Sequence, residues 1–132
     1  MTSDQLHLIP VWRVDWPHHV TSTYADMFWL PVLGPSSIAL LRLIARQPNM
    51  TPLTPTRPKL AEMLGLGGGA GAVRNIERTI RRLQDNGLAK QHSASIIELS
   101  VVLPTLRRRQ IDALDLRTQT AHAQILTNQR QK

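Results

Sequence analysis

The chain of 132 residues contains no cysteine, no apolar run long enough to cross a bilayer, and no basic segment followed by an apolar one at its start. The lack of cysteine excludes disulfide bonds and metal sites built on thiolates. A transmembrane helix needs about 20 mostly apolar residues, and a secretory signal peptide needs the basic and apolar regions that are missing here. We therefore expect a cytoplasmic protein that makes no use of a membrane.

Motifs typical of enzymes are also missing. Residues 67–72 match the pattern G-x-G-x-x-A of dinucleotide sites, but they follow a predicted helix rather than a strand, so we assign no such site. Neither a Gly-Lys-Ser/Thr P-loop nor a nucleophile-elbow pattern occurs. The five histidines are scattered without the spacing that builds a metal cage. We expect neither an enzyme nor a bound cofactor or metal.

Aromatic side chains are few, 4% of the residues, and all of them precede residue 30. They are Trp12, Trp16, Tyr24, Phe28 and Trp29. They can cover one flank of the core, or they can form a surface for a protein partner or a second copy of the chain, because aromatic residues are enriched in interfaces. Alternating apolar positions between residues 6 and 16 indicate an extended, half-buried segment. We interpret residues 1–34 as an aromatic-rich segment that packs on the core.

The positive charge is concentrated in one part of the chain. The formal net charge is +7, from 16 lysines and arginines against 9 acidic residues. Residues 1–56 contain three basic and three acidic side chains, whereas residues 57–109 contain ten basic and four acidic ones. A positive field confined to one module is the expected footprint of nucleic-acid binding. The alternative is a solvated basic face without a partner.

Residues 73–83 are the most informative stretch, because an apolar stripe and four arginines share one predicted helix. The stripe repeats at helical spacing and consists of Val73, Ile76, Ile80 and Leu83. At about 100° per residue, the opposite face carries Arg74, Arg78, Arg81 and Arg82. Glu77 can offset Arg81, and Asp85 can reach Arg81 or Arg82, but nothing nearby in the sequence neutralises Arg74 and Arg78. Such a column of guanidinium groups becomes useful when the partner is a polyanion.

The pattern around this stretch predicts the order of the elements. A helix begins at residues 35–37, capped by Ser36 or Ser37, and ends near Gln47. A proline-rich loop leads to a short helix over residues 58–64, and a glycine-rich connection leads to the arginine helix over residues 72–86. Two extended segments around a polar tip predict a β-hairpin over residues 88–102. Thr105 can cap a last helix through Leu114, followed by a polar stretch that is either helical or frayed.

This order of elements is that of a winged helix-turn-helix, in which a helix pair precedes a hairpin called the wing. We therefore expect a mainly α fold with a small β-hairpin, in the α+β class. Residues 35–104 are predicted to form the winged helix-turn-helix. Residues 105–132 are predicted to form a C-terminal helix and a polar tail.

Four segments carry a resemblance to known proteins. They are residues 24–37 (Tyr-Ala-Asp-Met-Phe-Trp-Leu-Pro-Val-Leu-Gly-Pro-Ser-Ser), residues 60–67 (Leu-Ala-x-x-Leu-Gly-Leu-Gly), residues 103–110 (Leu-Pro-x-Leu-x-x-Arg-x), and the pair at residues 121–122 (Ala-His). Through them, residues 16–122 resemble a group of small, mostly uncharacterised actinobacterial and actinophage proteins with a winged-helix core. The chain departs from the group at Gly71-Ala72, where Ser-Pro is frequent and would cap the arginine helix, and at Pro104-Thr105, where a doubled proline is frequent. The resemblance implies a DNA-binding fold and supplies no further function.

The winged-helix interpretation assigns contacts to particular side chains, because the second helix of the pair enters the major groove. Base contacts are expected from Arg74, Asn75 and Arg78, since arginine can bridge guanine O6 and N7 and asparagine can bridge adenine N6 and N7. Phosphate contacts are expected from Arg57, Lys59, Arg81 and Arg82. Backbone or minor-groove contacts near the wing tip are expected from Lys90, Gln91, His92 and Ser93. The run Arg107, Arg108 and Arg109 either extends this footprint or is simply solvated.

We therefore expect a protein that binds double-stranded DNA, as a sequence-specific transcriptional regulator associated with the nucleoid. A homodimer is expected, because one such module gives limited affinity. Two alternatives stay open. One is a protein-interaction module on a winged-helix scaffold, since a fold does not fix a function. The other is a replication or architectural factor that binds DNA with little sequence preference.

Overall fold

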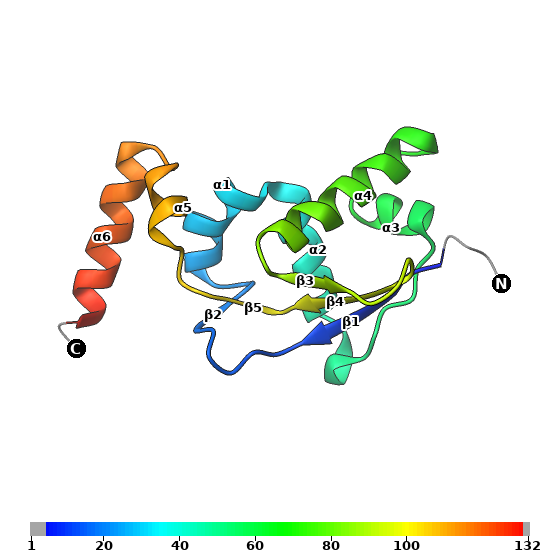
Figure 1. The fold of residues 1–132 in the computed structure, drawn as a ribbon, viewed down its shortest axis with the longest axis horizontal. Helices are drawn as coiled ribbons and strands as arrows, with labels where there is room; N and C mark the ends of the chain where they lie inside the picture. The colour runs from blue at the N-terminus through cyan, green and yellow to red at the C-terminus, as the bar shows by residue number, and fades with distance from the viewer. Residues whose placement is uncertain (1–4, 131–132) are drawn as a thin grey trace.

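Helices α2, α3 and α4 lie on one side of a small sheet, and the last helix, α6, lies at the opposite end of the molecule from α3 and α4 (Figure 1). The computed structural model describes residues 5–130. Residues 1–4 of the expected N-terminal segment and residues 131–132 of the expected tail lie outside the described residues. Helices and short strands together confirm the expected α+β class.

The main sheet has three strands in the order β1-β4-β3. The predicted hairpin is present as β3 (Ala89–Gln91) and β4 (Ile96–Ser100), which pair antiparallel. The strand β1 (His7–Val11) lies parallel to β4, with Leu8 opposite Ile97. This third strand was not predicted, because alternating apolar residues indicate an extended segment without identifying its distant partner. The hairpin is shorter than predicted, since β5 (Val102–Leu103) leaves it to pair with β2 (His18–His19).

The helix α2 (Pro35–Ala45) follows a turn that only glycine can make. Its N-cap is Gly34, with φ 83° and ψ 163°, and no side chain caps it, which corrects the prediction that Ser36 or Ser37 does so. Both serines are instead part of the helix. Before the turn, the chain winds through a π-helix (Ala25–Trp29, labelled η1) into the single turn α1 (Leu30–Leu33).

The two following helices are joined by a short glycine-rich turn. The helix α3 (Arg57–Met63) comes after a short 3-10 turn, η2 (Pro48–Met50), and begins at a Thr56 cap whose Oγ1 accepts from the backbone N–H of Lys59 at 3.2 Å. The helix α4 (Gly69–Asp85) has 17 residues and starts three residues before the predicted Ala72. Its N-cap is Gly68, again without a side-chain cap.

The core lies between these helices and the sheet. Leu8, Phe28, Leu41, Ile76 and Leu99 are fully buried members of one apolar cluster. On α4 the predicted stripe is buried at Ile76, Ile80 and Leu83, while Val73 is only half-buried. Ala72 and Thr79 complete the buried face.

Three of the five aromatic side chains form part of this core. Tyr24, Phe28 and Trp29 are buried, so they are not available to a protein partner, which corrects that part of the predicted partner surface. The indole Nε1 of Trp29 donates to the carbonyl oxygen of Pro104 at 2.8 Å. Trp16 is half-buried, and Trp12 keeps 55% of its surface exposed. Only the latter two can contribute to an interface.

The C-terminal part differs from the prediction at its start. The hydroxyl of Thr105 is hydrogen bonded to His18 Nε2 at 3.0 Å, so it does not cap a helix. The helix α5 (Arg108–Asp112) instead begins after Arg107 and is followed by α6 (Leu116–Arg130). Across residues 5–130, no helix combines the length and the apolar character that a membrane span requires.

Candidate nucleic-acid interface

One face of α4 is exposed and basic. Arg74, Arg78 and Arg81 are exposed and lie opposite the buried stripe of the same helix. No carboxylate of the described residues lies within ion-pair distance of any of the three. Packing on one side and free guanidinium groups on the other follow from the helical spacing seen in the sequence. The predicted exposure of these three arginines and the predicted lack of an acidic partner for Arg74 and Arg78 are confirmed, whereas Arg81 also lacks the acidic partner expected for it.

Arg57 has a structural role that the sequence did not indicate. Its Nε lies 2.6 Å from Glu77 Oε1 on α4, and its Nη2 donates to the carbonyl oxygen of Ala94 at 2.7 Å. Only 13% of the Arg57 side chain is exposed. The guanidinium of Arg57 joins α3, α4 and the tip of the hairpin, and the prediction that it contacts phosphate stays a prediction. Glu77 does not offset Arg81 as expected.

Arg82 is exposed, but one of its N–H groups is hydrogen bonded within the protein. Its Nη1 donates to the carbonyl oxygen of Leu33 at 3.0 Å, at the end of α1. A Cβ atom at Gly34 would lie 2.8 Å from the same Nη1. The guanidinium therefore points toward the turn before α2 rather than along the outward row of arginines. The prediction that Arg82 contacts phosphate stays a prediction.

Shallow depressions flank the outward arginines. Arg78 and Arg81 line one depression with Gln84 and Gln91, with a volume of about 280 Å³. They line another with Asp85 and Asn86, with a volume of about 320 Å³.

The two remaining residues predicted on the helix pair are placed differently. Asn75 is half-buried at the side of α4 that faces α2, so its amide is less accessible than Arg74 or Arg78. Lys59 is exposed on α3, with Nζ 3.6 Å from Glu62 Oε1. A pair this exposed and this long constrains Lys59 little, so its ammonium group can reach a phosphate.

The wing tip is exposed, but most of its polar side chains have partners within the chain. The amide of Gln91 accepts from Gln84 Nε2 at 2.8 Å, and His92 Nε2 lies 3.0 Å from Glu98 Oε2. Ser93 Oγ accepts from the backbone N–H of Ile96 at 3.1 Å and so stabilises the turn. The predicted contact through Ser93 is therefore the weakest of the set. Lys90 is exposed and has no partner of this kind in the described chain.

The arginines after the sheet lie beside the end of α4. Arg107 and Arg109 line a depression of about 190 Å³ together with Asp85 and Asn86. Gln110 Nε2 donates to Asn86 Oδ1 at 3.3 Å, which ties α5 to the end of α4. Arg108 is exposed, with Nε 3.4 Å from Asp112 Oδ1. Arg107 and Arg109 are therefore exposed beside the end of α4, an arrangement that is compatible with both of the options left open.

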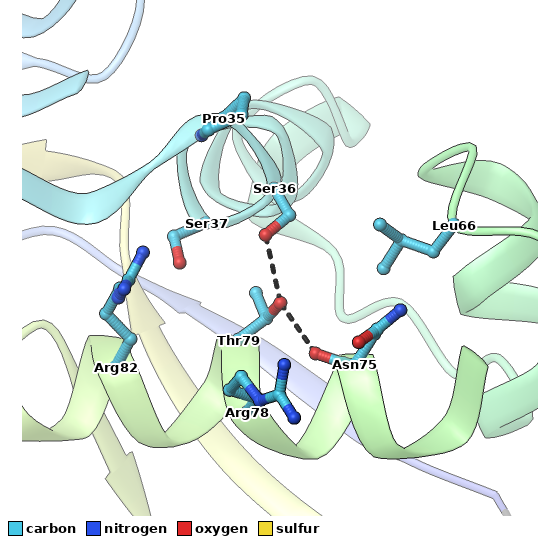
Figure 2. Close-up of a pocket in the computed structure, with 8 residues that line it drawn as sticks. All are labelled: Pro35, Ser36, Ser37, Leu66, Asn75, Arg78, Thr79 and Arg82. Atoms are coloured by element: carbon cyan, nitrogen blue, oxygen red, sulfur yellow. Dashed lines mark hydrogen bonds between the residues drawn. The ribbon is translucent and has the colours of Figure 1, made fainter. Parts of the chain in front are cut away.

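A pocket between α2 and α4 was not anticipated. It has a volume of about 420 Å³ and brings Ser36 and Ser37 opposite Arg78 and Arg82 (Figure 2). Ser36 Oγ lies 3.1 Å from Thr79 Oγ1, which donates to the carbonyl oxygen of Asn75 at 2.8 Å. Nothing in the sequence indicates this pocket, because the two serines match a helix-cap pattern and the pocket depends on how two distant helices cross.

Far from this face, two histidines flank one buried tyrosine. The rings of His18 and Tyr24 stack with centroids 3.6 Å apart, and the hydroxyl of Tyr24 lies 2.6 Å from His122 Nε2. Burial lowers the pKa of both histidines, and the charge of His122 lowers that of His18 further. Burial raises the pKa of Tyr24, although a hydrogen bond from the backbone N–H of Leu106 counteracts the rise. Within the described residues, no group of three or more His, Cys, Asp or Glu side chains could hold a metal ion.

The candidate interface thus consists of the outward face of α4, with Lys59, Lys90 and the arginines around α5 at its edges. The resemblance of residues 16–122 to winged-helix proteins stays a prediction. Comparisons of the chain with models of protein families, with curated protein sequences and with solved structures find no match.

Proposed function

We propose that the chain is a winged helix-turn-helix protein that binds double-stranded DNA, with α4 in the major groove and the β3–β4 hairpin as the wing. One observation carries the proposal. Arg74, Arg78 and Arg81 stand on the exposed face of a helix whose other face is packed, and no described carboxylate pairs with them. Three unpaired like charges on one helix face repel one another and are mildly destabilising by themselves. The same charges attract a polyanionic partner and so strengthen its binding.

The order and packing of the elements support the same proposal. α2 is followed by α3, a glycine turn, α4 and the hairpin, and α4 packs against both α2 and α3. The major groove of B-DNA is about 12 Å wide and admits one helix. α4, with 17 residues, is long enough to lie in it while its buried stripe stays on the core.

The proposal divides the basic residues by role. Arg74 lies in the second turn of α4 and Arg78 near the middle of the helix, and we assign both to base edges, which a recognition helix meets with its N-terminal side chains. Arginine reads guanine through two parallel hydrogen bonds. Arg81, Lys59 and Lys90 are placed around them and suit phosphates, which position the protein without reading sequence. The arginines at α5 lengthen this row beyond the end of α4.

Sequence-specific regulation of transcription at the nucleoid is the role we infer for such a module. Dimerisation belongs to the same proposal, because two half-sites raise both affinity and specificity. Trp12 and Val14 are exposed on the loop after β1. They offer an apolar surface for a second copy of the chain.

The proposal is tested by fluorescence anisotropy with a labelled random duplex, followed by selection of the preferred sequence from a random pool. Arg78→Ala is expected to lower the affinity for the selected duplex about tenfold or more, because one bidentate base contact is worth about 1–3 kcal/mol. The matched control is Arg46→Ala, which removes an equal charge from the exposed end of α2. Binding without any preferred sequence would favour the architectural alternative, and no binding at low salt would reject the proposal.

A further inference from the structure

The pocket between the start of α2 and the side of α4 has the composition of an anion site. Its wall contains two arginines, Arg78 and Arg82, and no carboxylate among the described residues that line it. Leu66 contributes an apolar side. Figure 2 shows the two serines of α2 pointing down toward α4 and Arg82 pointing up toward them.

Ser37 gives the strongest evidence for a ligand in this pocket. It is 1% exposed, and its Oγ has no hydrogen-bond partner among the described residues. Figure 2 shows this oxygen pointing into the space between α2 and Arg82. Buried hydroxyl groups almost always have a partner, so a missing one calls for an explanation such as a ligand. Ser36 does not serve in its place, since its hydroxyl lies 3.1 Å from Thr79 Oγ1.

The start of α2 adds further donors at the same place. Its first turn has no side-chain cap, and its first residue, Pro35, carries no N–H. The backbone N–H groups of Ser36 and Ser37 belong to this turn, where intrahelical acceptors are missing. An 11-residue helix also places partial positive charge at this end, which is why helix N-termini favour anions.

Arg82 is already positioned to join them. Its hydrogen bond to the carbonyl oxygen of Leu33 uses one Nη1 donor at 3.0 Å. An arginine has five N–H donors in a fixed planar fork, so the others remain for a ligand. Gly34 makes this close approach feasible, since any Cβ there would lie 2.8 Å from Nη1.

We propose that this pocket binds a phosphate group, held by Arg78 and Arg82, the hydroxyl of Ser37 and the first N–H groups of α2. The phosphate can belong to the DNA backbone or to a small phosphorylated molecule. The volume of about 420 Å³ falls within the usual range of small-molecule sites, about 300–1,000 Å³. Because Arg78 also faces the proposed DNA surface, a small ligand here competes with DNA for that side chain.

The test titrates the full chain with inorganic phosphate by calorimetry at constant ionic strength, with chloride as the reference salt. Saturable binding is expected. Ser37→Ala should weaken it about fivefold and Arg82→Gln about tenfold or more, because hydrogen bonds to a charged group are among the strong ones. Arg46→Gln, an equal charge change at the other end of α2 and outside this pocket, should stay within about twofold of the parent. The Ser37→Ala protein should melt no lower than the parent, since the change removes an unpaired buried hydroxyl.

Two further measurements identify the source of the phosphate and keep this inference separate from DNA binding. If the DNA backbone occupies the pocket, Ser37→Ala weakens duplex binding as well, and inorganic phosphate displaces the duplex beyond its effect on ionic strength. If a small molecule occupies it, Ser37→Ala leaves duplex affinity unchanged when phosphate is absent. The phosphate titration contains no DNA, so it succeeds or fails whether or not the chain binds a duplex. No saturation with phosphate, or equal binding by the parent, Ser37→Ala and Arg82→Gln proteins, would overturn the inference.

Discussion

Arg57 on α3 and Glu77 on α4 form an ion pair, with Nε and Oε1 2.6 Å apart. Because the same guanidinium also donates to the carbonyl oxygen of Ala94, one arginine connects both helices of the pair to the hairpin tip. The hairpin is thereby held in a fixed position relative to α4. A wing that contacts DNA together with a recognition helix requires such a fixed relationship.

Glu77→Gln should lower the stability of the protein and raise its affinity for DNA. The free energy of unfolding is expected to fall by about 1 kcal/mol, a modest loss because 54% of the Glu77 side chain is exposed. Duplex affinity should rise about two- to threefold, since one negative charge leaves the basic face. Urea denaturation and anisotropy measure the two quantities. Glu62→Gln is the control, because its exposed pair with Lys59 spans 3.6 Å and should leave stability unchanged; equal stability of both variants would show that the Arg57 bridge contributes nothing.

Gly34→Ala should be far more damaging than Gly67→Ala. Both glycines have a positive φ, 83° and 84°, which costs any other residue energy. Gly34 also has ψ 163°, and this combination of angles is essentially restricted to glycine. The new Cβ there would in addition displace Arg82 Nη1, 2.8 Å away, whereas at Gly67 it would meet open space. We expect a loss of about 3 kcal/mol for Gly34→Ala against about 1 kcal/mol for Gly67→Ala in denaturant unfolding. Equal losses would mean that the backbone at Gly34 does not adopt this conformation in solution.

Arg78→Ala should mainly reduce sequence discrimination, whereas Arg82→Ala should mainly reduce stability. Arg78 is outward and is proposed to read bases, so its loss should reduce the ratio of specific to random duplex affinity about tenfold. Arg82 is bound to the carbonyl oxygen of Leu33, so its loss should lower stability by about 1–2 kcal/mol and leave the ratio of specific to random duplex affinity unchanged. Competition assays with both duplexes and thermal melts test this. If both variants discriminate like the parent, the assignment of Arg78 to base contacts fails.

Stability should decrease below neutral pH because of His18, which is half-buried, and His122, which is buried. Burial lowers the pKa of His18 and His122 below the usual value of 6.5, so the unfolded chain binds protons more readily than the folded one. Their contribution is complete above about pH 6.5 and is lost as the pH falls through the lowered values. The hydroxyl of Tyr24 lies 2.6 Å from His122 Nε2, so a proton on that nitrogen disturbs the pair. Melting temperatures between pH 8 and 5 measure the effect.

The control for the pH effect is His122→Gln, which removes one titrating group from the cluster. At pH 8 the variant should melt at a lower temperature than the parent, because the substitution removes the native pair of His122 with Tyr24. Its further decline toward pH 5 should be smaller than that of the parent. A parent protein whose melting temperature is constant over this range would contradict the account of this cluster.

The sequence predicted the local features of the fold well and the distant contacts poorly. The spacing of Ile76, Ile80 and Leu83 fixed the buried face of α4, and therefore which of its arginines are outward. The glycine and proline positions gave the helix ends within a few residues. The pairing of β1 with β4 could not be predicted, since nothing local in a strand specifies a partner some 90 residues away.

The interface shows the same division. Exposure of Arg74, Arg78 and Arg81 follows from helix periodicity, which is local. The ion pair of Arg57 with Glu77 and the hydrogen bond of Arg82 to the Leu33 carbonyl oxygen depend on how α3, α4 and α1 cross. The burial of Tyr24 against His122 likewise joins residues from the two ends of the chain. Long side chains on helix surfaces can reach in several directions, so only the packed structure decides their partners.

The most direct test of the central claim is the salt dependence of duplex binding by the parent protein and by Arg74→Ala/Arg78→Ala/Arg81→Ala. With about five phosphates neutralised, the logarithm of the association constant should fall against the logarithm of salt concentration with a slope of about −4 to −5. The triple variant should bind at least about a hundredfold more weakly and show a shallower slope, because the outward face of α4 has lost its charge. If the parent shows no salt-dependent binding, or the triple variant matches its affinity and slope, the arginine face of α4 does not bind DNA.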